Sequence, residues 1–149
     1  MNISPISLAF KKCKEERRPA LLTYTVAGDN TKKKSLEILN AISNHADICE
    51  IGFPHNTPIA DGGQIQTSAY RAIKNGIKMK DVFQIVKNFK KNKSNLPLKF
   101  IFTLPTLKNR NMNILSIPSL KYFSNRKNRK FFSNIDFHFK PILSLSRFN

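Results

Sequence analysis

The chain has 149 residues, a length typical of one domain with a substantial core, and a net charge of +17 at pH 7. No uncharged run approaches the roughly 18 residues of a membrane span, and Lys11 and Lys12 come too early for a signal peptide. Only two cysteines, Cys13 and Cys49, are present, which argues against a disulfide framework, so we expect reduced thiols and a cytoplasmic location.

The first two thirds of the chain alternate between strand-like and helix-like segments. In chain order we expect a helix over 7–18, a strand over 20–26, a helix over 32–44, a strand over 46–51, helices over 65–73 and 79–89, and a strand over 98–103. Apolar residues at helical spacing mark the helices, and β-type runs mark the strands. Strands that alternate with helices through short loops predict parallel βαβ units wound in one direction.

Two carboxylates stand out near the second strand. Glu50 lies inside an apolar run, where an unpaired charge is costly, and Asp61 lies in the following loop, so both could face one pocket. Taken alone, Glu50 fits a strand-end carboxylate bonded to backbone N–H groups, and Asp61 fits an Asx turn. His45 and His55 lack metal-ligand spacing to each other or to a cysteine. We therefore expect no metal site, and we expect His55 to face solvent or a partner.

The last third of the chain has a different composition. Residues 104–149 hold nine Lys or Arg, one Asp or Glu and no glycine, and their aromatic residues keep no lasting period. We expect a basic, irregular tail, with the edge of the strand over 98–103 left unpaired. Basic and aromatic residues together suit single-stranded nucleic acid. Translated sequence under little selection has the same bias, so nonspecific adhesion to RNA is the expectation.

A family resemblance follows from the segment around the two carboxylates. Glu50–Pro54, then Pro58–Gly62 and Ile65-Gln66, resemble the signature of the tryptophan synthase alpha chain family. The Gly28-Asp29 turn and the segment Arg71–Gly76 fit the same family. The resemblance covers about residues 6–98. It implies an α/β fold, the N-terminal portion of a (β/α)8 TIM barrel with about three β/α units, whose active site lies at the carboxyl ends of the strands.

The resemblance also implies an activity. Family members are lyases of tryptophan biosynthesis that cleave indole-3-glycerol phosphate to indole and glyceraldehyde 3-phosphate by a retro-aldol reaction. Glu50 would be the acid/base that protonates the indole ring carbon, and an apolar site suits such an acid. Asp61 would hold the indole N–H and stabilise the cation. Tyr24 would form a wall of the indole pocket.

The family further implies which groups this chain binds. The alpha chain carries no cofactor, because pyridoxal phosphate belongs to the beta chain, with which two alpha chains form a heterotetramer containing two beta chains. Asn56-Thr57 departs from many relatives in the loop that faces the beta chain, which leaves that contact open.

The extent of the resemblance sets the expected domain organisation. We expect residues 1–103 to form a partial barrel and residues 104–149 an unmatched basic tail that is frameshifted or disordered. A complete barrel needs about 250 residues, so we expect a truncated chain that is inactive alone. The alternatives are a non-catalytic remnant that keeps a beta-chain contact and a basic protein that adheres to nucleic acid.

Overall fold

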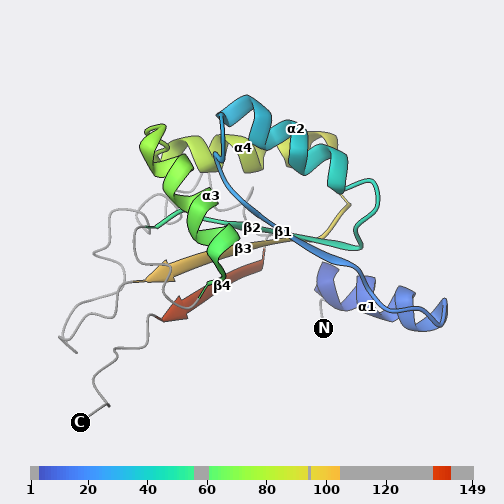
Figure 1. Ribbon diagram of the computed structural model, residues 1–149. Coiled ribbons are helices and arrows are strands. Elements are labelled where there is room, and N and C mark those ends of the chain that lie inside the picture. The colour runs from blue at the N-terminus through green and yellow to red at the C-terminus, as the bar shows by residue number, and fades with distance from the viewer. Residues whose placement is uncertain (1–3, 56–60, 94, 105–135, 142–149) are drawn as a thin grey trace, which may run out of the picture.

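The computed structural model describes residues 4–55, 61–93, 95–104 and 136–141 (Figure 1). The elements, in chain order, are α1 (Pro5–Glu15), β1 (Leu22–Val26), α2 (Lys32–Ile42), β2 (Ile48–Gly52), α3 (Gly63–Lys74), α4 (Met79–Asn92), β3 (Leu98–Leu104) and β4 (Asp136–Pro141). Among the described helices, none is long and apolar enough to cross a membrane.

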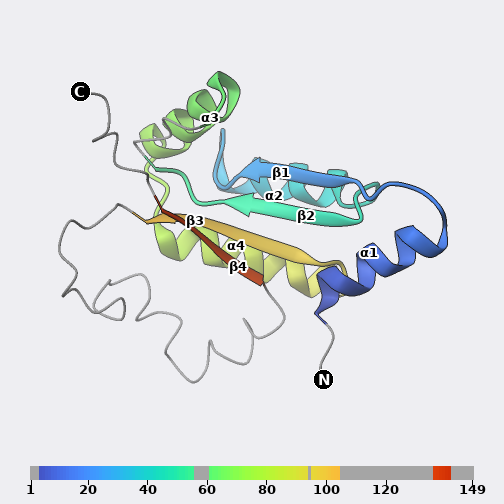
Figure 2. The ribbon, with the colours of Figure 1, turned by 90° about the horizontal axis from the view of Figure 1, so that it is seen from below.

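The four strands form one parallel sheet in the order β1-β2-β3-β4. Parallel neighbours require crossover connections. Helix α2 lies in the connection from β1 to β2, and α3 and α4 lie in the connection from β2 to β3. Helices α2 and α4 lie on one face of the sheet, α3 lies beside β1, and α1 lies near the amino ends of the strands (Figures 1 and 2). Consecutive parallel strands with helices on one face are the arrangement of successive β/α units in a barrel.

The main core lies between the sheet and the helices α2 and α4. Its buried members are Ala27, Leu39, Ala46, Cys49, Ile51, Val82, Phe83, Ile85, Val86, Phe89, Leu98 and Phe100. The rings of Phe83 and Phe100 stack with centroids 6.0 Å apart. Because side chains alternate along a strand, the burial of Cys49 and Ile51 against the helices turns Glu50 to the opposite face.

Two ion pairs link helices to other elements: one joins the end of α1 to the start of β2, and the other joins α2 to α4. Arg18, which follows α1, binds Asp47 just before β2 through two hydrogen bonds of 2.8 and 2.7 Å. Lys32 at the start of α2 lies 2.9 Å from Asp81 of α4. The Arg18 guanidinium holds the pKa of Asp47 well below its usual range, and Lys32 lowers the pKa of Asp81.

The helices and the first three strands lie where the sequence predicts them, with shifted ends. Helix α1 begins at Pro5 rather than at residue 7, because the Ser4 hydroxyl accepts the Ser7 N–H at 3.4 Å and caps the helix. Thr31 caps α2 in the same way, through the Lys34 N–H at 3.0 Å.

Strand β4 differs from the expectation of an irregular tail and an unpaired third strand. Residues Asp136–Pro141 run parallel to β3, with Lys99 opposite Asp136 and Leu104 opposite Pro141. The sheet therefore continues beyond residue 103. The segment alternates polar and apolar residues, as strands do, but it is short and its partner lies far back in the sequence. The other residues beyond 104 lie outside the described part of the chain, so the predicted disorder there is untested.

Candidate active site

Three side chains from neighbouring strands form a row on the face of the sheet opposite α2 and α4. The register places Tyr24 of β1 opposite Glu50 of β2, and Glu50 opposite Lys99 of β3. Neighbouring strands in register point matched residues to the same face, so the row follows directly from the pairing. We call these residues the Tyr24–Glu50–Lys99 row.

Glu50 forms an ion pair within this row. Its Oε1 atom lies 3.0 Å from Nζ of Lys99, and the two side chains are 16% and 30% exposed. The ammonium group compensates the cost of holding a carboxylate out of water. In the sequence, Lys99 stands out as a charged residue between the apolar residues Leu98 and Phe100. Only the strand register shows that it lies beside Glu50.

Tyr24 reaches along the sheet toward the carboxyl ends of the strands. A Cβ atom added at Gly52 would overlap its hydroxyl oxygen, so the ring lies directly on the Gly52 backbone. Burial, together with the negative charges of Asp61 and Glu50, raises the pKa of Tyr24 to about 12. Both carboxylates therefore lie within electrostatic range of the Tyr24 hydroxyl.

Asp61 lies just before α3, at the carboxyl-end side of the sheet. Its backbone carbonyl accepts a hydrogen bond of 2.7 Å from the Gln66 side chain. Its Oδ2 atom lies 3.7 Å from Nε2 of His55, an ion pair when the imidazole is protonated. The expectation that His55 faces solvent is wrong, because its side chain lies beside Asp61 and is only 18% exposed.

An ion pair between Arg71 and Asp29 links α3 to the end of β1. Arg71 binds Asp29 through hydrogen bonds of 2.7 and 2.8 Å and also donates to the Ser68 hydroxyl at 3.2 Å. The Arg71 guanidinium lowers the pKa of Asp29. Since Asp29 follows β1, this contact ties the start of α2 to α3 and so fixes the helix that follows Asp61.

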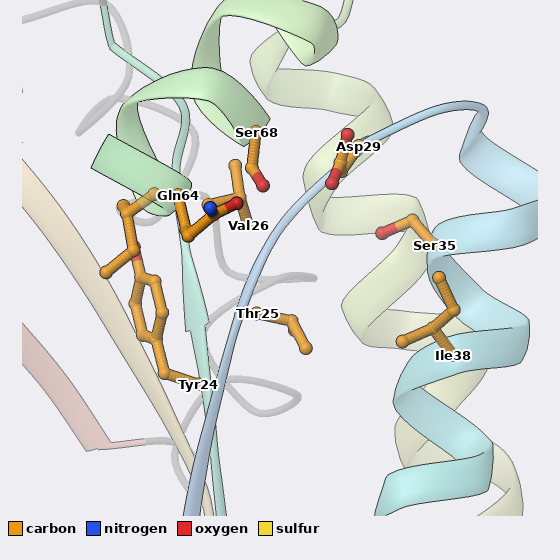
Figure 3. A pocket seen from close by; sticks show the side chains of 9 residues that line it. Tyr24, Thr25, Val26, Asp29, Ser35, Ile38, Gln64 and Ser68 are labelled. Carbon is orange, nitrogen blue, oxygen red and sulfur yellow. The ribbon is translucent and has the colours of Figure 1, made fainter. Parts of the chain in front are cut away.

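A groove of about 250 Å³ lies between β1, α2 and α3 (Figure 3). Its lining residues are Tyr24, Thr25, Val26, Asp29, Ser35, Ile38, Gln64, Ile65 and Ser68. Within the described residues, the Thr25 Oγ1 atom is buried without a hydrogen-bond partner. No group of three or more His, Cys, Asp or Glu side chains in the described part of the chain is placed to hold a metal ion.

The chain matches the family model of the tryptophan synthase alpha chain over residues 10–115. It is 78% identical, over 96 residues, to the tryptophan synthase alpha chain of Pelagibacter ubique, an alignment that covers 64% of this chain and 36% of that protein. The chain therefore spans about a third of the length of this curated relative.

Solved structures agree with this match. The tryptophan synthase alpha subunit of Legionella pneumophila is 30% identical with a TM-score of 0.61, covering 68% of this chain and 39% of that one. A tryptophan synthase α2β2 complex from Pyrococcus furiosus is similar at 42% identity and a TM-score of 0.54, covering 56% of this chain and 36% of that one. The described part thus has the fold of part of the family's (β/α)8 barrel.

Proposed function

Because the chain belongs to the tryptophan synthase alpha chain family, we propose that it acts in tryptophan biosynthesis as a lyase on indole-3-glycerol phosphate. The supporting observation is that Glu50 lies opposite Tyr24 in the register of a parallel sheet, and that Asp61 follows the same strand, on its carboxyl-end side. That side carries the active site in barrel enzymes.

In the proposed reaction, the bond between the indole ring and the glycerol phosphate chain breaks. Glu50 gives a proton to the ring carbon that carries the side chain. The bond to the side chain then breaks with its electron pair passing to the ring, and the adjacent hydroxyl returns a proton to the Glu50 carboxylate as the carbonyl of glyceraldehyde 3-phosphate forms. Protonation makes the ring cationic at nitrogen. A fixed carboxylate at the N–H, the role proposed for Asp61, stabilises that charge. Tyr24 supplies a flat surface for the ring.

Lys99 affects how Glu50 can work. Its ammonium lies 3.0 Å from Oε1, so it holds one oxygen of the proposed acid in place. A carboxyl that must transfer a proton at a defined point gains from a fixed position. Lys99 is therefore a positioning residue in the proposed reaction, acting through Glu50.

The partner in this proposal is a tryptophan synthase beta chain, which would take up the indole and carries the pyridoxal phosphate. The similar α2β2 complex from Pyrococcus furiosus supports such an assembly. Asn56-Thr57, the departure singled out in the sequence, lies outside the described residues. The proposed location of both chains is the cytoplasm.

The test is indole release from indole-3-glycerol phosphate by the purified chain, alone, where we expect no turnover, and with a tryptophan synthase beta chain, where the variants are compared. Glu50→Gln and Asp61→Asn are each expected to lower kcat by a factor on the order of 100 or more, the usual contribution of a general acid or an electrostatic stabiliser. Glu37→Gln is the matched control, because it removes an exposed carboxylate from α2. Unchanged turnover in Glu50→Gln contradicts the assigned role, and no turnover by the wild type in either setting contradicts the activity.

A further inference from the structure

The turn that ends α3 contains Asn75-Gly76, the only place in the chain where glycine follows asparagine. Asn75 is the C-terminal cap of α3, and Gly76 has a φ of +71°. A residue with a side chain is strained at that φ, so the turn requires glycine. Among the described residues, no atom lies within 4 Å of the position that a Cβ of Gly76 would take, so the backbone there is uncrowded.

The side chain of Asn75 joins α3 to the turn after β1. Its Nδ2 atom donates a hydrogen bond to the backbone carbonyl of Asn30. Since a carbonyl oxygen only accepts, an amide fits this place and a carboxylate does not. Ile77 packs on the same turn, because a Cβ added at Gly28 would lie 2.5 Å from its Cδ1 atom. The structure therefore needs a donor at position 75 and glycine at position 76.

We propose that Asn75 is a site of spontaneous deamidation, to which asparagine followed by glycine is the most prone pair. Glycine favours the reaction because no side chain hinders its backbone nitrogen and its dihedral angles are free. The nitrogen of Gly76 attacks the side-chain carbonyl carbon of Asn75. A C–N bond forms, the bond to the amide nitrogen breaks, and ammonia leaves with the proton from Gly76. Water then opens the five-membered imide to aspartate or isoaspartate.

The folded chain slows this reaction through two hydrogen bonds. The Gly76 N–H donates to the Ile73 carbonyl at 2.9 Å, and the Asn75 amide is held by Asn30. The nitrogen must leave the first carbonyl and the amide must leave the second before they can react. Helix ends open at a low cost in free energy. We therefore expect deamidation in the native chain, at a rate below that of the unfolded chain.

Deamidation weakens the attachment of α3. A carboxylate at position 75 loses the hydrogen bond to Asn30 and repels that carbonyl oxygen. It also places a negative charge at the C-terminal end of α3, where the helix dipole disfavours it. The ion pair between Arg71 and Asp29 then holds the helix to the turn after β1 without Asn75. Because α3 follows Asp61, the loss reaches the candidate site, but the modification itself requires no activity of the chain.

The test is peptide mapping by mass spectrometry of the purified full chain, incubated at mildly alkaline pH with and without urea. We expect the Asn75 peptide to gain the mass that separates an acid from an amide, and urea to speed this change about tenfold or more. Asn44 is the control within the same digest, because it also lies exposed in the turn after a helix but precedes His45. It is expected to stay an amide.

Asn75→Asp imitates the aspartate product. It is expected to unfold at a lower urea concentration than the wild type and to speed hydrogen exchange of the Gly76 amide, whereas Asn44→Asp should change neither. Equal conversion of Asn75 and Asn44 overturns the assigned site, and this comparison can be made in urea whether or not a variant folds. A rate that urea leaves unchanged overturns the protection by the fold. An Asn75→Asp chain as stable as the wild type overturns the loss of attachment.

Discussion

At the scale of single residues, the contact between Tyr24 and Gly52 sets the shape of the candidate site. The phenol rests on the Gly52 backbone, where any side chain would collide with it. Gly52→Ala is expected to displace the ring and lower the free energy of unfolding by about 1–3 kcal/mol, as overpacking of a filled site does. Urea unfolding measures this change. Gly62→Ala is the control, since nothing lies within 4 Å of a Cβ there; equal losses in both variants would show that the Tyr24 contact is unimportant.

The raised pKa of Tyr24 gives a second prediction at this scale. The ultraviolet phenolate signal that Tyr24→Phe removes is expected to titrate near 12, above the ordinary value of about 10. Burial is the main cause, and the charges of Asp61 and Glu50 add to it, so Asp61→Asn combined with Glu50→Gln should lower the midpoint only in part. A raised phenol pKa contributes stability that is present below about pH 10 and is lost as the pH rises toward 12. An ordinary midpoint in the wild type would place Tyr24 in water, away from both carboxylates.

At the scale of the elements, the ion pair between Arg18 and Asp47 connects α1 to the start of β2. Because the folded pKa of Asp47 is lowered, its contribution to stability is present above the unfolded value of about 3.9 and is lost as the pH falls through the folded pKa. The difference in unfolding free energy between the wild type and Asp47→Asn is thus expected to shrink between about pH 6 and about pH 2. Glu15→Gln, which breaks an exposed pair with Lys11, should show little difference at any pH. A difference for Asp47→Asn that does not change with pH would contradict this account.

The elements also show how far sequence reasoning reaches. Helical spacing located α2, α3 and α4, and the apolar runs located β1, β2 and β3, because those signals are local. The pair between Lys99 and Glu50 was missed, since it depends on the register of two strands far apart in the sequence. Strand β4 was missed for a related reason: six alternating residues are a weak signal, and pairing with β3 is what forms the strand.

At the scale of the whole molecule, the net charge of +17 predicts adhesion to polyanions independent of sequence. Binding to single-stranded RNA is expected to weaken steeply between about 0.05 M and about 0.2 M salt and to be equal for unrelated sequences. Fluorescence anisotropy with two RNAs of different sequence measures both properties. A complex that survives the higher salt and prefers one RNA would indicate a specific nucleic-acid site instead.

The row formed by Tyr24, Glu50 and Lys99 has a consequence for how this chain tolerates insertions and deletions. The three residues share a face because the three strands are paired in this register. The lengths of the loops between the strands do not affect that pairing. A residue gained or lost in a loop changes the spacing in sequence but leaves the row intact. A residue gained or lost within β2 exchanges its two faces, which sends Glu50 into the apolar core and Ile51 to the polar side. Inserting or deleting one residue inside β2 therefore disrupts both the candidate site and the core. Inserting or deleting several residues in a neighbouring loop disrupts neither.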